Sequence, residues 1–209
     1  MQIAVVTFDG FNEIDSLVAA HMLNRVQLPG WKAEIACPSE TVRSMNGVRI
    51  TAQRPLEFAN QADVVLVGSG RLTREIIADD AIMSRLRLDP RRQLVGSQCS
   101  GALVLARLGL LDAVPACTDL STRPHLEAAG IRVLEQSFHA AGNVATAGGC
   151  LSAQYLAAWV VWSLLGRDAV EDVFRYVAPV GELEQSVARA VSAVEPYVET
   201  ARTRAGSGG

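Results

Sequence analysis

The feature that most constrains the fold of this chain is a regular alternation of short β-branched runs with longer amphipathic stretches. Alternation of this kind is typical of βα units, which place parallel strands in one sheet and helices on both of its faces. The runs predicted as strands are residues 3–8, 32–37, 48–51, 64–68, 94–97, 131–135 and 144–147. The stretches with apolar residues at helical spacing are 17–25, 72–79, 81–88, 101–108, 123–129, 151–165, 167–177 and 183–200. The pattern therefore predicts an α/β protein with a mainly parallel sheet.

A β-hairpin is predicted across residues 43–50, because Asn46-Gly47 is the strongest short turn signal in the chain. No internal repeat is present, and no linker rich in Gly, Pro or Ser precedes the C-terminal end. We therefore interpret residues 1–200 as a single domain. Residues 201–209 are predicted to form a tail, because the last of them have no apolar periodicity.

Composition excludes several classes of protein. The chain has 209 residues, 49% of them hydrophobic, which is enough for one buried core and argues against disorder. Its 19 Lys and Arg against 22 Asp and Glu leave a net charge of −3 without a basic stripe, so nucleic acid is not an expected partner. The longest apolar stretch, residues 155–165, is shorter than the roughly 20 residues that a membrane span needs. Residues 1–6 run directly into a predicted strand and show no signal peptide, so a cytoplasmic location is expected.

The four cysteines, Cys37, Cys99, Cys117 and Cys150, are too far apart in sequence to form a CxxC pair. Disulfides are not expected in a reducing compartment, and no metal site is predicted. Packing is the favoured interpretation of Cys37, which closes a predicted strand, and of Cys117, which lies in a loop. Cys150 opens a predicted helix after two glycines, so both packing and a place at the mouth of a site remain open.

The segment from Gln93 to Ala106 is the most informative about chemistry. A predicted strand leads into small residues, then Cys99, then Gly101, then an amphipathic helix. This order is typical of a nucleophile elbow, in which a sharp turn lifts one side chain above the end of a sheet. The helix N-terminus is expected to lower the thiol pKa from about 8.5, and the Ser100 N–H to point toward an anion beside the sulfur. The alternative is that Cys99 is a small buried packing residue.

An acidic loop follows the first predicted strand and contains Asp9, Glu13 and Asp15. Loops that follow parallel strands meet at the same edge of the sheet, so an acid of this loop is expected near Cys99. There it would act as a general acid or base for the attacking sulfur. Asp9 and Glu13 are interpreted as solvated, and Asp15 is also a candidate helix N-cap. Spacing alone does not separate Asp15 from Glu13.

A second turn of small residues, Gly68-Ser69-Gly70, follows another predicted strand. The N–H of Gly70 is a candidate second donor to an oxyanion pocket. A phosphate loop is excluded because no Gly-Lys-Ser/Thr follows. None of the three histidines is adjacent in sequence to Cys99, and we interpret His21 as a core or interface residue.

These segments together resemble the ThiJ/PfpI superfamily. The resemblance covers nearly the whole chain and rests on residues 4–10 with Asp15 five positions on, residues 64–70, the Cys99 elbow and residues 143–149. It implies a flavodoxin-like three-layer sandwich with a mainly parallel sheet and helices on both faces. The spacing from Gly10 to Asp15 resembles that of the family's carboxyl group beside the cysteine, which favours Asp15 over Glu13. Aspartate at this point is most similar to the isocyanide hydratase branch.

That branch implies a lyase that hydrates isocyanides (isonitriles) to N-formamides. In this interpretation Cys99 is the nucleophile, Asp15 is the general acid/base, and Ser100, Gly70 and Ser69 form the oxyanion and substrate-binding set. No metal or organic cofactor is implied. The resemblance also implies a homodimer acting on a small-molecule substrate, without nucleic acid or membrane.

Departures from the family pattern keep alternatives open. Ser100 stands where the protease-like members have histidine, which argues against a Cys-His peptidase. Gly68-Ser69-Gly70 stands where members of the family usually have Pro-Gly-Gly. Thr118-Asp119 falls in a segment where hydratases tend to carry Thr-His-Trp. Pocket roles for Thr118, Asp119 and Cys150 therefore stay open. One alternative is a glyoxalase or deglycase acting on α-oxoaldehydes. Another is a non-enzymatic redox sensor, in which protonated Asp15 stabilises a Cys99 sulfinate.

Overall fold

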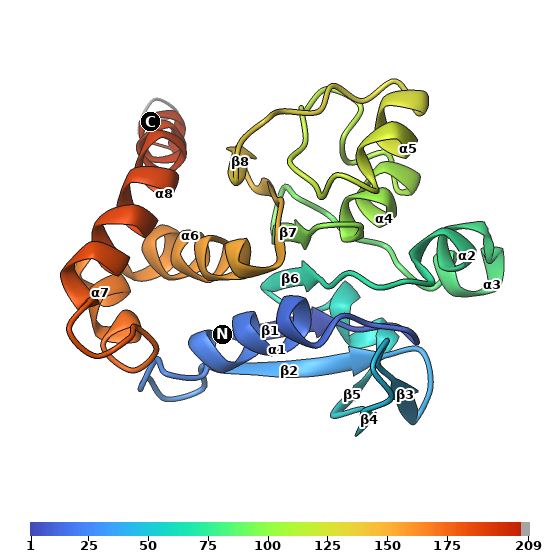
Figure 1. The fold of residues 1–209 in the computed structure, drawn as a ribbon, viewed down its shortest axis with the longest axis horizontal. Helices are drawn as coiled ribbons and strands as arrows, with labels where there is room; N and C mark the ends of the chain where they lie inside the picture. The colour runs from blue at the N-terminus through green and yellow to red at the C-terminus, as the bar shows by residue number, and fades with distance from the viewer. Residues whose placement is uncertain (206–209) are drawn as a thin grey trace.

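The computed structural model describes residues 1–205, with side chains through Val198. Within these residues one sheet has seven strands in the order β5-β2-β1-β6-β7-β9-β8. The sheet strands are β1 (Gln2–Val6), β2 (Lys32–Cys37), β5 (Arg54–Pro55), β6 (Val64–Val67), β7 (Leu94–Gln98), β8 (Phe138–Ala141) and β9 (Val144–Ala147). Every neighbouring pair is parallel except β8 and β9, which pair antiparallel. The order β2-β1-β6-β7-β9 is that of a flavodoxin-like fold, as the resemblance implied (Figure 1).

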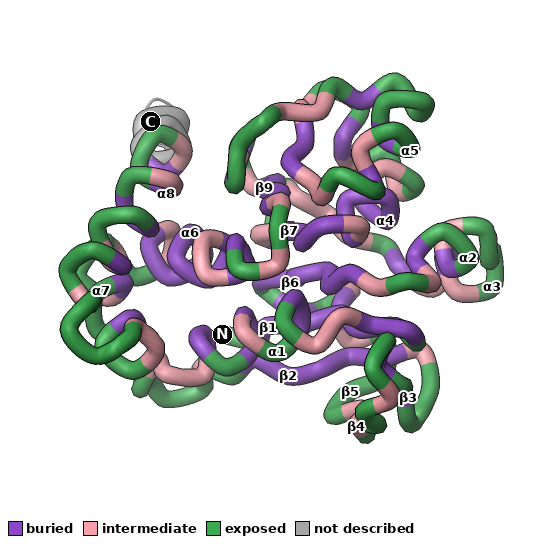
Figure 2. The backbone as a smooth tube through the Cα atoms, in the orientation of Figure 1, coloured by how far each residue is buried: buried purple, intermediate pink, exposed green. Residues whose placement is uncertain are grey.

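The central strands are buried along nearly their whole length because both faces of the sheet are covered. In β6, Val64 and Leu66 belong to one core cluster, and Val65 and Val67 to the other. This alternation follows from the two-residue period of a strand, and continuous burial is typical of parallel sheets. Figure 2 shows that the central strands are buried, whereas the outer helices are largely exposed.

One face of the sheet is covered by helices from both ends of the chain. They are α1 (Glu13–Leu23), α6 (Ala153–Leu165), α7 (Asp168–Phe174) and α8 (Leu183–Ala205), with α7 and α8 packed outside α6 (Figure 1). Trp159 of α6 is fully buried in this layer. Gly96 of β7 lies beneath α6, where an added Cβ would come within 2.9 Å of Leu156 Cδ2. The sheet and α6 therefore lie closer together than any residue larger than glycine at position 96 would allow.

The opposite face is covered by shorter helices from the middle of the chain. They are the 3-10 helix η1 (Leu56–Asn60), α2 (Thr73–Ala78), α3 (Asp80–Met83), α4 (Gly101–Arg107) and α5 (Arg123–Ala128). Leu103 and Leu105 of α4 pack with Leu126 of α5 in the second core cluster. The three predicted layers are confirmed. None of the helices in the described residues is both long and apolar enough to cross a membrane.

The predicted hairpin forms from β3 (Thr41–Arg43) and β4 (Arg49–Thr51), which pair antiparallel. Gly47 has φ of 95°, so it supplies the left-handed conformation that the turn requires. The hairpin is tied to the loop after β1, because the Met45 N–H donates to the Phe11 carbonyl at 2.8 Å. It therefore borders the carboxyl ends of the central strands.

The structure departs from the predicted elements in several places. The strand predicted at residues 131–135 is wrong: within it only Val133 forms an isolated bridge, to Ala116. The strand beyond it is β8, where Phe138 and Ala140 pack into the core, so pairing with β9 and burial outweigh weak strand propensity. α1 begins at Glu13, four residues before the predicted start, and α3 ends at Met83, well short of residue 88. α8 continues past residue 200 to Ala205, and residues 206–209 of the predicted tail lie outside the described residues.

Candidate functional site

Four neighbouring strands, β1, β6, β7 and β9, end beside one cleft of about 540 Å³. In open parallel sheets, ligands bind beyond the carboxyl ends of the strands, near the point where the strand order reverses. Every predicted site residue lines this cleft. Asp15 follows β1, Ser69 and Gly70 follow β6, and Cys99 and Ser100 follow β7.

Cys99 occupies the elbow that the sequence predicts. Its φ of 47° is the one positive φ of a non-glycine residue among those described, a strained conformation typical of functional turns. The Cys99 N–H donates to the Ala147 carbonyl at 2.8 Å, and the Thr118 hydroxyl donates to the Cys99 carbonyl at 2.9 Å. A Cβ at Gly101 would come within 2.5 Å of the Val67 carbonyl oxygen. The turn is therefore closely braced, and glycine at position 101 permits it.

Asp15 is the acid that faces Cys99. Its side chain is buried in the first turn of α1, where Asn12 is the N-cap and accepts from the Ile14 N–H at 3.1 Å. The N-cap interpretation of Asp15 is therefore wrong. Asp15 Oδ2 accepts a very short hydrogen bond from the Ser69 hydroxyl, and Oδ1 has no hydrogen-bond partner among the described residues. One carboxylate oxygen is thus held in place while the other is available for chemistry.

The other two acids of the loop are engaged by the hairpin. Glu13 accepts from the Ser44 hydroxyl at 2.5 Å and from the Asn46 side chain at 3.0 Å. Asp9 accepts from the Arg43 N–H at 2.8 Å. Both carboxyl groups therefore hold the hairpin against the loop, and neither is among the residues that line the cleft.

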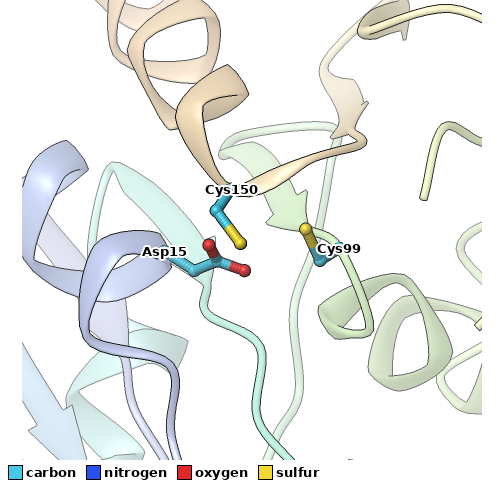
Figure 3. Close-up of side chains that lie close together, drawn as sticks. All are labelled: Asp15, Cys99 and Cys150. Atoms are coloured by element: carbon cyan, nitrogen blue, oxygen red, sulfur yellow. The ribbon is translucent and has the colours of Figure 1, made fainter. Parts of the chain in front are cut away.

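Cys150 is the functional candidate that sequence reasoning left unresolved. It opens the 3-10 helix η2 (Cys150–Ser152) directly after β9, and its sulfur accepts from Asn12 Nδ2 at 3.2 Å. One carboxylate oxygen of Asp15 and the sulfurs of Cys99 and Cys150 all lie within 4.8 Å of one another (Figure 3). In Figure 3 the carboxylate of α1 faces both sulfurs. The sequence signal that could have placed Cys150 at the site is the pair of glycines before it, which follows the end of a predicted strand.

Burial and the charge of the Asp15 carboxylate raise the pKa of the Cys99 thiol. The same two causes raise the pKa of Cys150. The expectation of a lowered pKa at a helix N-terminus is therefore wrong, because α4 has only seven residues and desolvation outweighs its dipole. A charged Asp15 and a Cys99 thiolate repel each other in this buried setting. The Cys99 sulfur is therefore held as the neutral thiol.

The predicted oxyanion donors differ in their availability. The Ser100 N–H has no acceptor among the described residues, whereas the Gly70 N–H donates to the Ser100 hydroxyl at 3.2 Å. That hydroxyl also lies 2.8 Å from Thr73 Oγ1. The Gly70 N–H therefore reaches a ligand only when the Ser100 side chain turns away. The Ser69 hydroxyl is likewise engaged, by Asp15.

Polar side chains surround the mouth of the cleft. Arg71, Arg74 and His125 line it, and Arg74 Nη1 lies 3.4 Å from His125 Nε2. Burial alone would raise the pKa of Asp119, but hydrogen bonds from Ser121 and Thr122 outweigh it and lower that pKa. Asp119 is therefore a charged residue of the lining whose carboxylate is already held by its neighbours.

The remaining cysteines and His21 lie away from the cleft lining. Cys37 and Cys117 are fully buried, which confirms the packing interpretation, and burial raises their pKa values to about 11 and about 12. His21 is exposed, so its interpretation as a core residue is wrong. Asp15, Cys99 and Cys150 are the one group of metal-ligating side chains found close together among the described residues. The two sulfurs suit soft cations, whereas the carboxylate oxygen suits hard ones.

The fold is a flavodoxin-like sheet with a cysteine at a strained strand-to-helix elbow, where a buried carboxyl group faces its sulfur. A nucleophile elbow of an α/β protein has this layout. The model of the DJ-1/PfpI family matches residues 1–161, and the chain belongs to that family. No curated protein matches the chain.

Solved structures of the family share the fold at low sequence identity. A ThiJ/PfpI family protein from Pseudomonas syringae has a TM-score of 0.76 at 20% identity, covering 96% of this chain and 90% of its own. DJ-1 from Schizosaccharomyces pombe has a TM-score of 0.72 at 17% identity, covering 86% and 100%. Oxidised DJ-1 from Toxoplasma gondii has a TM-score of 0.72 at 20% identity, covering 84% and 97%. At these identities the similarity shows the fold and leaves the activity to be argued from the site.

Proposed function

We propose that this protein is a cysteine-dependent hydratase that converts isocyanides to N-formamides, with Cys99 as nucleophile and Asp15 as general acid/base. The observation that carries the proposal is the buried Asp15 carboxylate, one oxygen of which lies within 4.8 Å of two thiol sulfurs. An isocyanide carbon needs a soft nucleophile and a proton donor on the same side, and this pair supplies both.

The first half of the reaction forms a bond between sulfur and carbon. Asp15 takes the Cys99 proton as the sulfur attacks the terminal isocyanide carbon, and then delivers that proton to the same carbon. The product is a thioimidate, R–N=CH–S–Cys99. Because burial and Asp15 raise the thiol pKa, proton transfer accompanies attack and no standing thiolate is required.

The second half of the reaction consumes one water. Asp15 takes one proton from water as the water oxygen adds to the thioimidate carbon, and it passes that proton to the nitrogen. It then moves the proton of the new hydroxyl group to the departing sulfur. The carbon–sulfur bond then breaks, releasing R–NH–CHO and restoring the Cys99 thiol. In this proposal the Ser100 N–H, which donates to no acceptor among the described residues, stabilises negative charge that develops beside the sulfur. Ser69 holds the carboxylate in position throughout.

A second candidate substrate class is the α-oxoaldehydes. Arg71, Arg74 and His125 at the mouth offer N–H donors to carbonyl oxygens, which an isocyanide lacks. The same thiol would attack the aldehyde carbon, and the same carboxylate would move the protons. Comparing turnover of the two substrate classes separates these candidates.

We also propose a cytoplasmic homodimer that has no metal or organic cofactor and consists of one domain over residues 1–200. Exposed apolar side chains near the cleft support the dimer. The exposed Ile14 immediately precedes Asp15 in the chain, and the exposed Leu151 immediately follows Cys150. The exposed Met45 lines the cleft itself. Apolar side chains gathered at one face are typical of a subunit interface.

Formation of N-formamide from a model isocyanide tests the proposal. The wild type is expected to turn the substrate over, and Cys117→Ser, which removes a buried cysteine outside the cleft, is expected to retain turnover. Consumption of methylglyoxal without any isocyanide turnover would move the assignment to the second candidate.

A further inference from the structure

Cys150 places a second thiol beside the proposed nucleophile, and the hydration mechanism does not use it. Its sulfur lies within 4.8 Å of the Cys99 sulfur, well short of the separation between unrelated cysteines but longer than the ~2.05 Å of a disulfide. One of the two sulfurs must therefore move for a bond to form.

The structure shows which sulfur is free to move. Cys99 is buried at a strained turn that is braced by backbone and side-chain hydrogen bonds. Cys150 is half-buried: its sulfur accepts a hydrogen bond from the Asn12 amide at 3.2 Å, and its carbonyl accepts a longer one from Gln98 Nε2 at 3.4 Å. It follows Gly149, where φ is 85° and an added Cβ would meet nothing closer than 4.0 Å. Rotation of the Cys150 side chain toward Cys99 is therefore less restrained than the reverse.

We propose that Cys150 is a resolving cysteine, which closes a reversible disulfide with Cys99 after a hydroperoxide has oxidised Cys99 to the sulfenic acid. Asp15 has a carboxylate oxygen within 4.8 Å of both sulfurs and moves the protons in both steps. This inference concerns the fate of the sulfur on oxidation and holds whichever substrate the site hydrates.

The chemistry balances over two steps. In the first, the Cys99 sulfur attacks a hydroperoxide, ROOH, the O–O bond breaks, and the thiol proton passes through Asp15 to the leaving oxygen, so that Cys99–SOH and ROH form. In the second, the Cys150 sulfur attacks the sulfenic sulfur, the S–O bond breaks, and the oxygen leaves as water. Asp15 takes the Cys150 proton and supplies it to that leaving oxygen. The two thiols lose two electrons to the peroxide, and an added dithiol restores them.

Proximity decides between the disulfide and further oxidation. Conversion of the sulfenic acid to a sulfinic acid needs a second peroxide molecule from solution. Attack by Cys150 is intramolecular, and groups held side by side react as if present at concentrations far above those in solution. The thiol of Cys150 therefore intercepts the sulfenic acid and protects Cys99 from irreversible oxidation.

Peptide mass mapping under non-reducing conditions tests this on the native chain. After brief treatment with a small excess of hydrogen peroxide and alkylation of free thiols, we expect a cross-linked pair of peptides containing Cys99 and Cys150. The intact chain should have lost two hydrogens and two titratable thiols, and dithiothreitol should restore both. A two-oxygen adduct on Cys99 with Cys150 still alkylated would overturn the proposal.

Variants give the matched comparison. Cys150→Ser is expected to accumulate the two-oxygen adduct on Cys99, whereas Cys117→Ser, which also removes one buried thiol, is expected to form the cross-link like the wild type. Equal adduct formation in wild type and Cys150→Ser would contradict a resolving role. If Cys150→Ser does not fold, the cross-linked peptide of the wild type still decides the matter. Mapping is independent of turnover, so failure of the hydratase proposal leaves this result readable.

Discussion

The two cysteines of the cleft end neighbouring parallel strands, yet they are held in opposite ways. Cys99 after β7 sits at φ of 47°, with its N–H, its carbonyl and the following glycine all fixed by close contacts. Cys150 after β9 lies on a short 3-10 turn and is only half-buried. The difference teaches that the fold fixes one sulfur for attack and leaves the other adaptable. Rigid placement is what a nucleophile needs, whereas a resolving thiol must move.

The largest effect is expected from Cys99→Ala, which removes the fixed sulfur. Turnover of a model isocyanide should fall by about 10³-fold or more in kcat/KM, since loss of a nucleophile removes the covalent path. Steady-state kinetics with Cys117→Ser as control measures this. Undiminished turnover in Cys99→Ala would remove the basis for the contrast between the two cysteines.

Asp15→Asn keeps the shape of the side chain but removes its charge and its ability to take a proton. We expect kcat to fall by about 10²–10⁴-fold, the range typical of general acid/base groups. Because the Asp15 carboxylate contributes to the raised pKa of Cys99, the same change should lower that pKa. At a fixed mildly alkaline pH the thiolate fraction then rises, so iodoacetamide should alkylate Cys99 faster in the variant. A slower alkylation rate would show that Asp15 does not oppose the thiolate.

Ser69→Ala removes the hydroxyl that holds Asp15 Oδ2. A charge-assisted hydrogen bond of this kind is worth about 1.5–3 kcal/mol, so we expect kcat to fall roughly tenfold or more. KM should change little, because in this account Ser69 acts through Asp15 and not on the substrate. Ser69→Thr, which keeps a hydroxyl, is expected to recover most of the activity; equal losses in both variants would indicate a packing defect instead.

The smallest effects concern stability and compare the turns beside the two cysteines. Gly101→Ala would push a Cβ to 2.5 Å from the Val67 carbonyl oxygen, and overpacking of this kind costs about 1–3 kcal/mol or more. Gly149→Ala meets open space but keeps a left-handed φ of 85°, which costs about 1–2 kcal/mol. Urea unfolding of both variants measures the two costs. A larger loss of unfolding free energy for Gly149→Ala than for Gly101→Ala would contradict the conclusion that the turn at Cys99 is the more rigid of the two.

The elbow could be predicted because its signals are local. A strand, small residues and a helix are consecutive in the sequence, and only the strained φ of Cys99 was left for the structure to show. The position of Cys150 could not be predicted in the same way. Its approach to Cys99 depends on β9 pairing beside β7, a contact between segments about fifty residues apart that no local pattern encodes.

Burial explains the main failures of sequence reasoning. Residues 131–135 include the apolar Ile131, Val133 and Leu134 but lie in a loop. Phe138–Ala141 forms a strand because it pairs with β9 and because the core accepts its side chains. The pKa of Cys99 was expected to follow a helix N-terminus, a local feature, but desolvation and Asp15 determine it. In both cases the local signal was outweighed by contacts that form only in the folded chain.

The most direct test of the central claim is to look for the bond between Cys99 and substrate. Acid quenching of the wild type during its first turnover of a model isocyanide should trap the thioimidate on the enzyme. Peptide mass spectrometry is expected to show one added substrate molecule on Cys99, alongside N-formamide produced by the wild type. An adduct confined to Cys150, or neither adduct nor formamide, would contradict the account.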